Sequence, residues 1–167
     1  TAIMAGKRDI AWVADTLVSH ARNKLTPKLA AMDAEYADGI ILEQIPPDFM
    51  FVSEKINPPG YPLLAVIGER TEMHPFDGQS RYGIEHHHLT LAIALISRGE
   101  PEEQLKRRTI RTVRALEETL LEDRTLAASV NDTIILEKEY SPIIAEGEQF
   151  TTFHQEGQIS VRVETMT

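Results

Sequence analysis

The sequence has 167 residues, a formal net charge of −9 and no cysteine. A chain of this length forms one ordinary domain and buries enough apolar surface to fold without a covalent or metal staple. The lack of cysteine excludes disulfides, thiolate chemistry and a cysteine-based zinc site. The acidic balance argues against tight nucleic-acid binding, because each phosphate contact needs a nearby Lys or Arg.

No membrane-targeting segment is visible in the sequence. Residues 1–8 lead into no long apolar run, which argues against a signal peptide. The longest apolar runs, at residues 63–67 and 91–96, are far shorter than the ~20 residues that cross a bilayer. We therefore expect the chain to be made in a cytoplasm and kept or assembled there.

The first predicted element is helical and covers residues 8–36, where apolar residues recur at steps of three and four. Thr26-Pro27 interrupts this stretch. Thr26 is suited to cap a second helix with Pro27 in its first turn, whereas the unbroken apolar phase favours one kinked helix. The sequence leaves both alternatives open. Gly39 is the expected stop.

Three predicted strands follow, at residues 49–52, 61–68 and 82–97. The polar connection at residues 69–81 contains His74-Pro75 and Asp77-Gly78, and it is predicted to be a flexible loop or a wide hairpin tip. Alternation in the third strand predicts two different faces. The core face carries His87, Leu89, Leu91, Ile93 and Leu95. The opposite, fairly polar face carries His86, His88, Thr90, Ala92 and Ala94.

The second predicted helix covers residues 101–123, because a proline and two acidic residues mark its start and apolar residues form a stripe along it. A strand at residues 131–140 follows. Residues 149–154 and 158–164 then predict a terminal hairpin around Glu156-Gly157. The predicted fold class is α+β: a mainly antiparallel or mixed β-sheet with two long amphipathic helices packed on one face, in a single domain spanning residues 1–167.

The first candidate site is the run His86-His87-His88. In a strand, His86 and His88 share a face and could hold a metal with a carboxylate such as Glu72 or Asp77. No other ligand spacing supports a metal, and the alternative is a solvated or interfacial polar face. We predict no metal and no cofactor.

The second candidate site is basic and lies on the second predicted helix: Lys106, Arg107, Arg108, Arg111 and Arg114. Such a cluster suits a contact with phosphate or with an acidic partner subunit. The alternative is a solvated face that is balanced within the helix, since Glu103 lies four residues before Arg107 and Glu118 four residues after Arg114. The acidity of the chain favours a protein partner over DNA.

The sequence carries no recognisable catalytic motif. It contains no G-x-S-x-G, Walker loop or G-x-G-x-x-G, and Glu137-Lys138-Glu139 has the wrong spacing for the Glu-x-Lys strand of two-metal nucleases. The chain is therefore predicted not to be an enzyme.

The order of the predicted segments resembles the tail terminator and tail completion (head–tail joining) proteins of long-tailed bacteriophages. The likeness rests on the helix at residues 8–36, the strand opened by Tyr61-Pro62, the alternating strand at 86–95, the helix at 101–123, the motif Tyr140-Ser141-Pro142 and the closing strand at 159–164. It covers nearly the whole chain and rests on layout, since no short motif defines the family.

The resemblance implies a virion protein, assembled in the host cytoplasm, that forms a ring, usually a hexamer, at the head–tail junction. Such a ring caps the tail tube and docks on the head connector, leaving a channel for DNA. The implied partners are further copies of the chain, the tail tube protein and the head-completion or connector protein. Genomic DNA would pass without specific binding, and no membrane is involved.

Assembly contacts are expected at three places. The connection at residues 69–81, with His74 and Asp77, is a candidate docking loop, and the basic cluster of the second helix is a candidate subunit contact. An edge strand of the terminal hairpin could pair with a neighbour's edge, as a head-to-tail ring allows. Two other functions stay open: a metal-dependent enzyme using His86 and His88, and a small monomeric or dimeric adaptor module.

Overall fold

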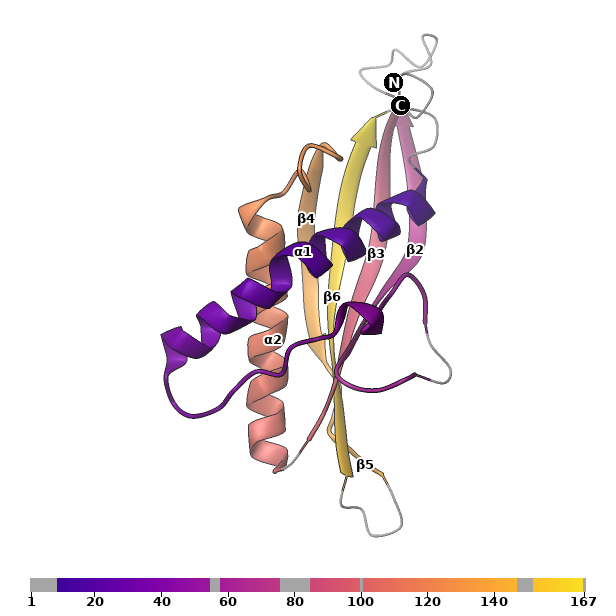
Figure 1. Cartoon of the computed structure of the whole chain (residues 1–167). Coiled ribbons are helices and arrows are strands. Elements are labelled where there is room, and N and C mark those ends of the chain that lie inside the picture. Colours follow the sequence, from indigo (N-terminus) through magenta and orange to yellow (C-terminus); the bar gives the residue numbers. More distant parts are fainter. Residues whose placement is uncertain (1–8, 55–57, 76–84, 100, 147–151, 167) are drawn as a thin grey trace.

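The computed structural model describes residues 9–54, 58–75, 85–99, 101–146 and 152–166. Its elements, in chain order, are α1 (Ile10–Tyr36), the short 3-10 helix η2 (Pro47–Phe49), β1 (Met50–Phe51), β2 (Leu63–Pro75), β3 (Glu85–Arg98), α2 (Glu102–Glu122), β4 (Asp132–Tyr140), β5 (Ile144–Glu146) and β6 (Thr152–Met166). Both helices pack against one long twisted sheet, and α1 crosses the strands obliquely (Figure 1). The predicted α+β class is confirmed.

The sheet is mixed and has the order β1-β2-β3-β6-β4. Only β1 and β2 run parallel, whereas β2–β3, β3–β6 and β4–β6 are antiparallel. The short strand β5 pairs with the start of β6. The two longest partners, β3 and β6, therefore form the centre of the sheet, while β4 and the β1–β2 pair form its sides.

Helix α1 is one continuous helix. Of the two alternatives that the sequence left open, a single helix interrupted by Pro27 is therefore correct, and two separate helices are not. It begins after Asp9, whose side chain accepts a hydrogen bond from the backbone N–H of Trp12 at 2.9 Å. Pro27 lies inside it without ending it. The helix ends before Ala37, which has left-handed backbone angles, and Gly39 with a φ of 82° completes the turn.

One hydrophobic core lies between the helices and the sheet. It joins the buried stripes of α1 and α2 to alternate residues of the three long strands, which are Leu64 and Val66 of β2, Leu89, Leu91, Ile93 and Leu95 of β3, and Ile159, Val161 and Val163 of β6. The predicted core face of β3 is confirmed. Since strand side chains alternate, the residues between these point to the face of the sheet that the helices leave bare.

The predicted terminal hairpin is wrong. Residues 152–166 form the single strand β6, which pairs with β3 on one side and with β4 and β5 on the other. Gly157, which the sequence suggests as a turn residue, instead lies where α2 comes closest to the sheet. A Cβ built on it would lie 2.4 Å from Cγ2 of Val113, so only glycine lets the helix pack this closely.

The connection at residues 69–81 was predicted to be a flexible loop or a wide hairpin tip. Its two flanking strands do form a hairpin, but residues 69–75 belong to the strand and not to a loop or tip. Strand β2 continues to Pro75 and stays paired with β3, from Arg70 opposite Thr90 to Pro75 opposite Glu85. A shift of register between Gly68 and Arg70 makes Glu69 a bulge. The polar composition reflects a strand with solvated residues rather than a loop. Residues 76–84, including Asp77 and the predicted start of the third strand, lie outside the described part of the chain.

Candidate interaction surfaces

Two of the predicted basic contact residues join α2 to the end of α1. The Arg111 guanidinium, with only 10% of its side chain exposed, forms a two-point contact with Asp38 at 3.0 and 2.6 Å. It also lies 3.8 Å from the centre of the Tyr36 ring. The hydrogen bond from Arg111 lowers the pKa of Asp38 to about 2. Arg111 thus fixes the turn after α1 against α2.

Arg114 extends the same contact by one turn. It donates hydrogen bonds to the Tyr36 hydroxyl at 2.6 Å, to Glu35 at 3.3 Å and to Glu118 at 3.1 Å. The hydrogen bond with Tyr36 raises the pKa of Arg114 above its ordinary value. The Glu118 contact is the balancing pair predicted from the sequence. Arg114 keeps 40% of its side chain exposed, so its outer edge is open to a partner.

The remaining basic residues lie nearer to the start of α2. Arg107 pairs with Glu103 at 3.1 Å, as the sequence predicts, and Arg108 lies 3.8 Å from Glu43. Lys106 borders a hollow of about 540 Å³, which is lined by Ile110, Tyr140, Ser141, Pro142, Ile143 and Gln155. Ile110 and Tyr140 are both 40% exposed, so this hollow is partly apolar. That Lys106, Arg107, Arg108, Arg111 and Arg114 contact another subunit stays a prediction.

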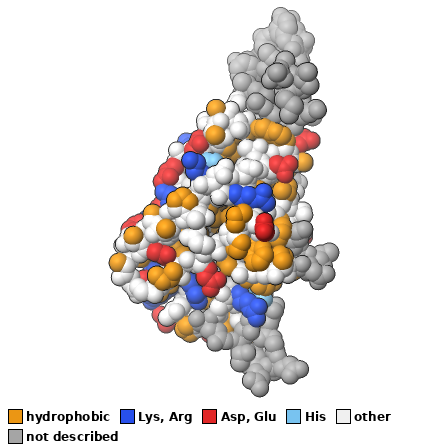
Figure 2. Space-filling view, viewed as in Figure 1, with side chains coloured by type: hydrophobic (Ala, Val, Ile, Leu, Met, Phe, Trp, Pro, Cys, Tyr) orange, Lys and Arg blue, Asp and Glu red, His pale blue; other side chains and the backbone are white. Residues whose placement is uncertain are grey.

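Charges of both signs are mixed on the side of the molecule that carries the helices. Figure 2 shows Lys and Arg side chains interspersed with Asp and Glu there, while hydrophobic side chains gather around η2 and the segment beside it. No continuous basic stripe is visible on this face. This distribution does not favour binding to a nucleic-acid backbone, which needs clustered positive charge.

The bare face of the sheet carries a groove of about 520 Å³ with a mixed polar and apolar lining. Its floor consists of outward side chains of β2 and β3, which are Leu63, Ala65, Ile67, Ala92, Ala94 and Ile96. Its borders include Glu54, Glu69 and Glu156. The alternation in the sequence predicted that Ala92 and Ala94 lie on this face and that the face is fairly polar. Both alanines do lie on it but are buried, as are Leu63 and Ala65, while Ile67 and Ile96 are partly exposed.

Acidic residues predominate among the charged residues of the same face. By strand register they are Glu69, Glu72, Asp132, Glu137, Glu139, Glu156 and Glu164, against Arg70, Arg98 and Arg162. Glu137 and Glu139 are neighbours on β4, and the hydrogen bond and repulsion between them raise the pKa of Glu137. The charged residues of the bare face are thus mainly acidic.

The histidine run lies where β3 passes between β2 and β6. Glu72 and Glu164 are the cross-strand neighbours of His88, and the His88 Nε2 atom lies 3.7 Å from Glu164. The backbones of His74 and His86 are opposite each other in the β2–β3 register. Among the residues that the structure describes, no group of three or more His, Asp or Glu side chains is placed to hold a metal ion.

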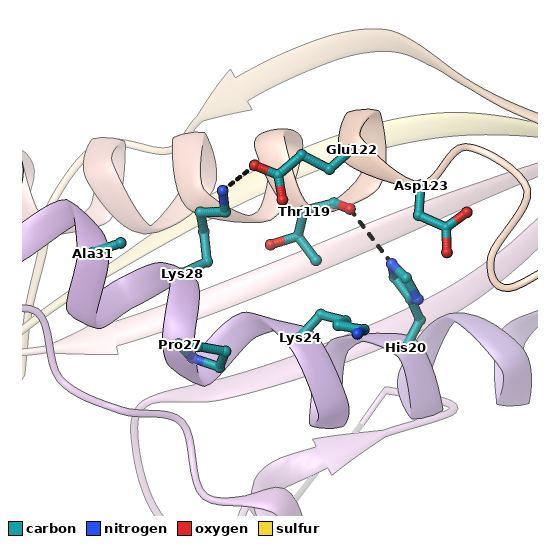
Figure 3. Close-up of a pocket in the computed structure, with 8 residues that line it drawn as sticks. All are labelled: His20, Lys24, Pro27, Lys28, Ala31, Thr119, Glu122 and Asp123. Atoms are coloured by element: carbon teal, nitrogen blue, oxygen red, sulfur yellow. Dashed lines mark hydrogen bonds and ion pairs between the residues drawn. The ribbon is translucent and has the colours of Figure 1, made fainter.

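A pocket of about 410 Å³ opens between the two helices (Figure 3). His20, Lys24 and Lys28 line it from α1, and Thr119 and Glu122 line it from α2. The His20 Nε2 atom lies 3.4 Å from the Thr119 carbonyl oxygen, and Lys28 forms an ion pair with Glu122. These polar contacts connect α1 to α2, so the pocket belongs to the contact between the helices.

In the described parts of the chain, neither helix combines the length and the apolar character that crossing a bilayer requires. Comparison of the sequence with protein-family models and with curated proteins found no match. Among solved structures, the chain is similar to one described as a virion of native gene transfer agent (GTA) particle, with a TM-score of 0.30 and 9% sequence identity. The similarity covers 85% of this chain and 92% of the other. A TM-score this low does not establish a shared fold.

Proposed function

We propose that the chain is a structural virion subunit, not an enzyme, that forms a ring at the head–tail junction of a phage-like particle. The ring would terminate the tail tube and join it to the head connector, leaving a channel for DNA. Its partners would be further copies of the chain, the tail tube protein and a connector protein. It would be located in the tail or neck, after assembly in the host cytoplasm.

The observation that carries this proposal is the one-sided packing of the sheet. Both helices lie on one face, and the other face carries a groove with a mixed polar and apolar lining. Because no helix covers this second face, it is available as a contact or lining surface in an assembly. In a ring, the helices would form the outer wall and the bare face would line the inside.

The charge of the bare face fits a channel through which DNA slides. Most of its charged residues are acidic, and acidic walls repel phosphate instead of binding it. A protein that gripped DNA would need the opposite sign on this face. The sequence layout, which resembles that of tail terminator proteins, supports the same function independently.

The first test is the mass of the purified protein in solution by light scattering, with negative-stain imaging of the same fraction. We expect rings with a central hole, since a heterologous contact closes into a ring when the rotation allows it, and about six copies, the number that the resemblance to tail terminator proteins implies. Monomers or dimers at every concentration, together with no binding to isolated tail tubes, would refute the ring and favour an adaptor module.

A second test addresses the channel wall. Replacing Glu156 and Glu164 by arginine removes the acidic excess of the bare face and places two more cations on it. The E156R/E164R variant should therefore retain more duplex DNA than the unaltered chain in a gel-shift assay, and salt should weaken the binding steeply. The unaltered chain should not retain DNA. A matched control carries arginine at Glu103 and Glu122, which are exposed on α2. Equal retention by both variants would contradict the assignment of the bare face to the channel.

A further inference from the structure

Two strand edges of the sheet have no partner among the described residues. On one side, β4 pairs with β6 along Asp132–Tyr140 and leaves its other edge open. On the other side, β1 covers β2 only at Leu64 and Ala65, so the edge of β2 is open from Val66 onward. Open edges present unpaired N–H and C=O groups that readily pair with another strand.

The directions of these two strands are complementary. β2 is antiparallel to β3, β3 to β6, and β6 to β4, so β4 and β2 run in opposite directions. Two copies that are related by rotation about an axis along the strands therefore bring β4 of one beside β2 of the next in antiparallel orientation. Antiparallel pairs are the more stable arrangement per residue.

The register of such a pair follows from where β1 ends. The first open position on β2 is Val66, and Tyr140 is the last residue of β4, so placing Tyr140 opposite Val66 uses the whole open edge. Each strand then contributes one bulge, at Glu69 in β2 and at Leu136 in β4. The two bulges fall beside each other and keep the faces matched along the pair.

We propose that β4 of one copy adds in antiparallel fashion to the open edge of β2 in a second copy, with Glu137 opposite Arg70. This contact rests on the proposed ring, and it names the surfaces through which the ring closes. Because it uses two different edges, it is heterologous and repeats from copy to copy.

The charges at the paired edges support this partner. In this register Glu137 and Arg70 lie on the same bare face of the joined sheet, as their own cross-strand partners Ser160 and Thr90 do. Arg70 is 68% exposed and forms an ion pair within its own strand, with Glu72 at 2.7 Å. Glu137 has a second acid, Glu139, beside it. An arriving arginine would relieve the repulsion between these two carboxylates.

The contact can be tested by cysteine cross-linking, since the chain has no cysteine of its own. Directly opposed residues of an antiparallel pair have Cα atoms about 4.5–5.5 Å apart, which a disulfide spans. The Arg70→Cys/Glu137→Cys double variant, mildly oxidised, should give a ladder of covalent oligomers on a non-reducing gel that collapses on reduction. Each single variant should stay monomeric on the gel, because a heterologous contact never brings two identical residues together.

The matched control is Arg70→Cys/Glu103→Cys, because Glu103 is 81% exposed but lies on α2, away from the edge. It should give no ladder. Circular dichroism confirms that each variant is folded, and a short bis-maleimide repeats the experiment without the strict geometry of a disulfide.

The outcomes separate this contact from the proposed function. Rings without cross-links in the double variant would overturn the strand pairing and leave the ring intact. Covalent dimers of the single Glu137→Cys variant would overturn it too, in favour of a symmetric β4–β4 contact. A ladder with filaments instead of rings would support the pairing and contradict the ring. Monomers with no cross-links at any concentration would overturn both.

Discussion

Replacing Gly157 by alanine tests how α2 packs on the sheet. The new Cβ would lie 2.4 Å from Cγ2 of Val113 and 3.2 Å from Cγ2 of Thr109, and both residues are fully buried. Both side chains are branched at Cβ and have few rotamers available, so the helix backbone has to move. Overpacking of this kind costs about 1–3 kcal/mol. For a domain of this size, that corresponds to a fall in Tm of roughly 3–10 °C.

The measurement is urea unfolding followed by circular dichroism, with a double-mutant cycle against Val113→Ala. Truncating Val113 alone costs about 2 kcal/mol of lost burial. In that background the added methyl fills vacated space, so Gly157→Ala should be neutral or stabilising there. The matched control is Gly68→Ala, whose Cβ would meet the end of the Ile10 side chain at 2.9 Å and should cost less than about 1 kcal/mol. Two results would refute the close packing of Gly157 against Val113: additive free-energy effects of Gly157→Ala and Val113→Ala, or equal costs of Gly157→Ala and Gly68→Ala.

Three further predictions concern stability. Arg111 lowers the pKa of Asp38 to about 2, so their contact stabilises the folded state above pH 3.8 and is lost as the pH falls toward 2. In Asp38→Asn, the free energy of unfolding should therefore fall less with acidification than in the wild type. Urea titrations from pH 2 to 6 measure this, and identical profiles would contradict it. In the wild type, the folded state raises the pKa of Glu137, so the free energy of unfolding should decrease as the pH rises above 4.5. Glu137→Gln should remove this decrease. Unfolding free energies of variant and wild type that change in parallel with pH would contradict the prediction. Leu91→Ala in the fully buried centre of β3 should cost about 2–5 kcal/mol by denaturant unfolding, whereas a loss below 1 kcal/mol would contradict a continuous core.

The periodic pattern of the sequence predicted the helices and the central strand because it reflects short-range geometry. Apolar steps of three and four marked α1 and α2, and the alternation around Leu91 predicted the core face of β3. The acidic residues beside Pro101 marked the start of α2. The balancing pairs at Arg107 and Arg114 were also predictable, since residues four apart on a helix are neighbours in any fold.

Other features depended on contacts between residues that are distant in the chain. Glycine in a sequence indicates a turn as readily as a close approach. Pairing with Leu95 and Tyr140 places Gly157 within a strand, and the position of Val113 explains why the residue there is glycine. In the sequence, Arg111 belongs to a cluster of basic residues. In the structure it is largely buried, because it forms an ion pair with Asp38, which follows α1. The order of the strands, and with it the two open edges and the bare acidic face, is set by pairing across the sheet. The sequence by itself therefore determined the two helices and the core face of the central strand, because these follow from short-range periodicity. The tertiary structure decided the extent and pairing of the other strands and the surfaces that stay free, because both depend on long-range packing.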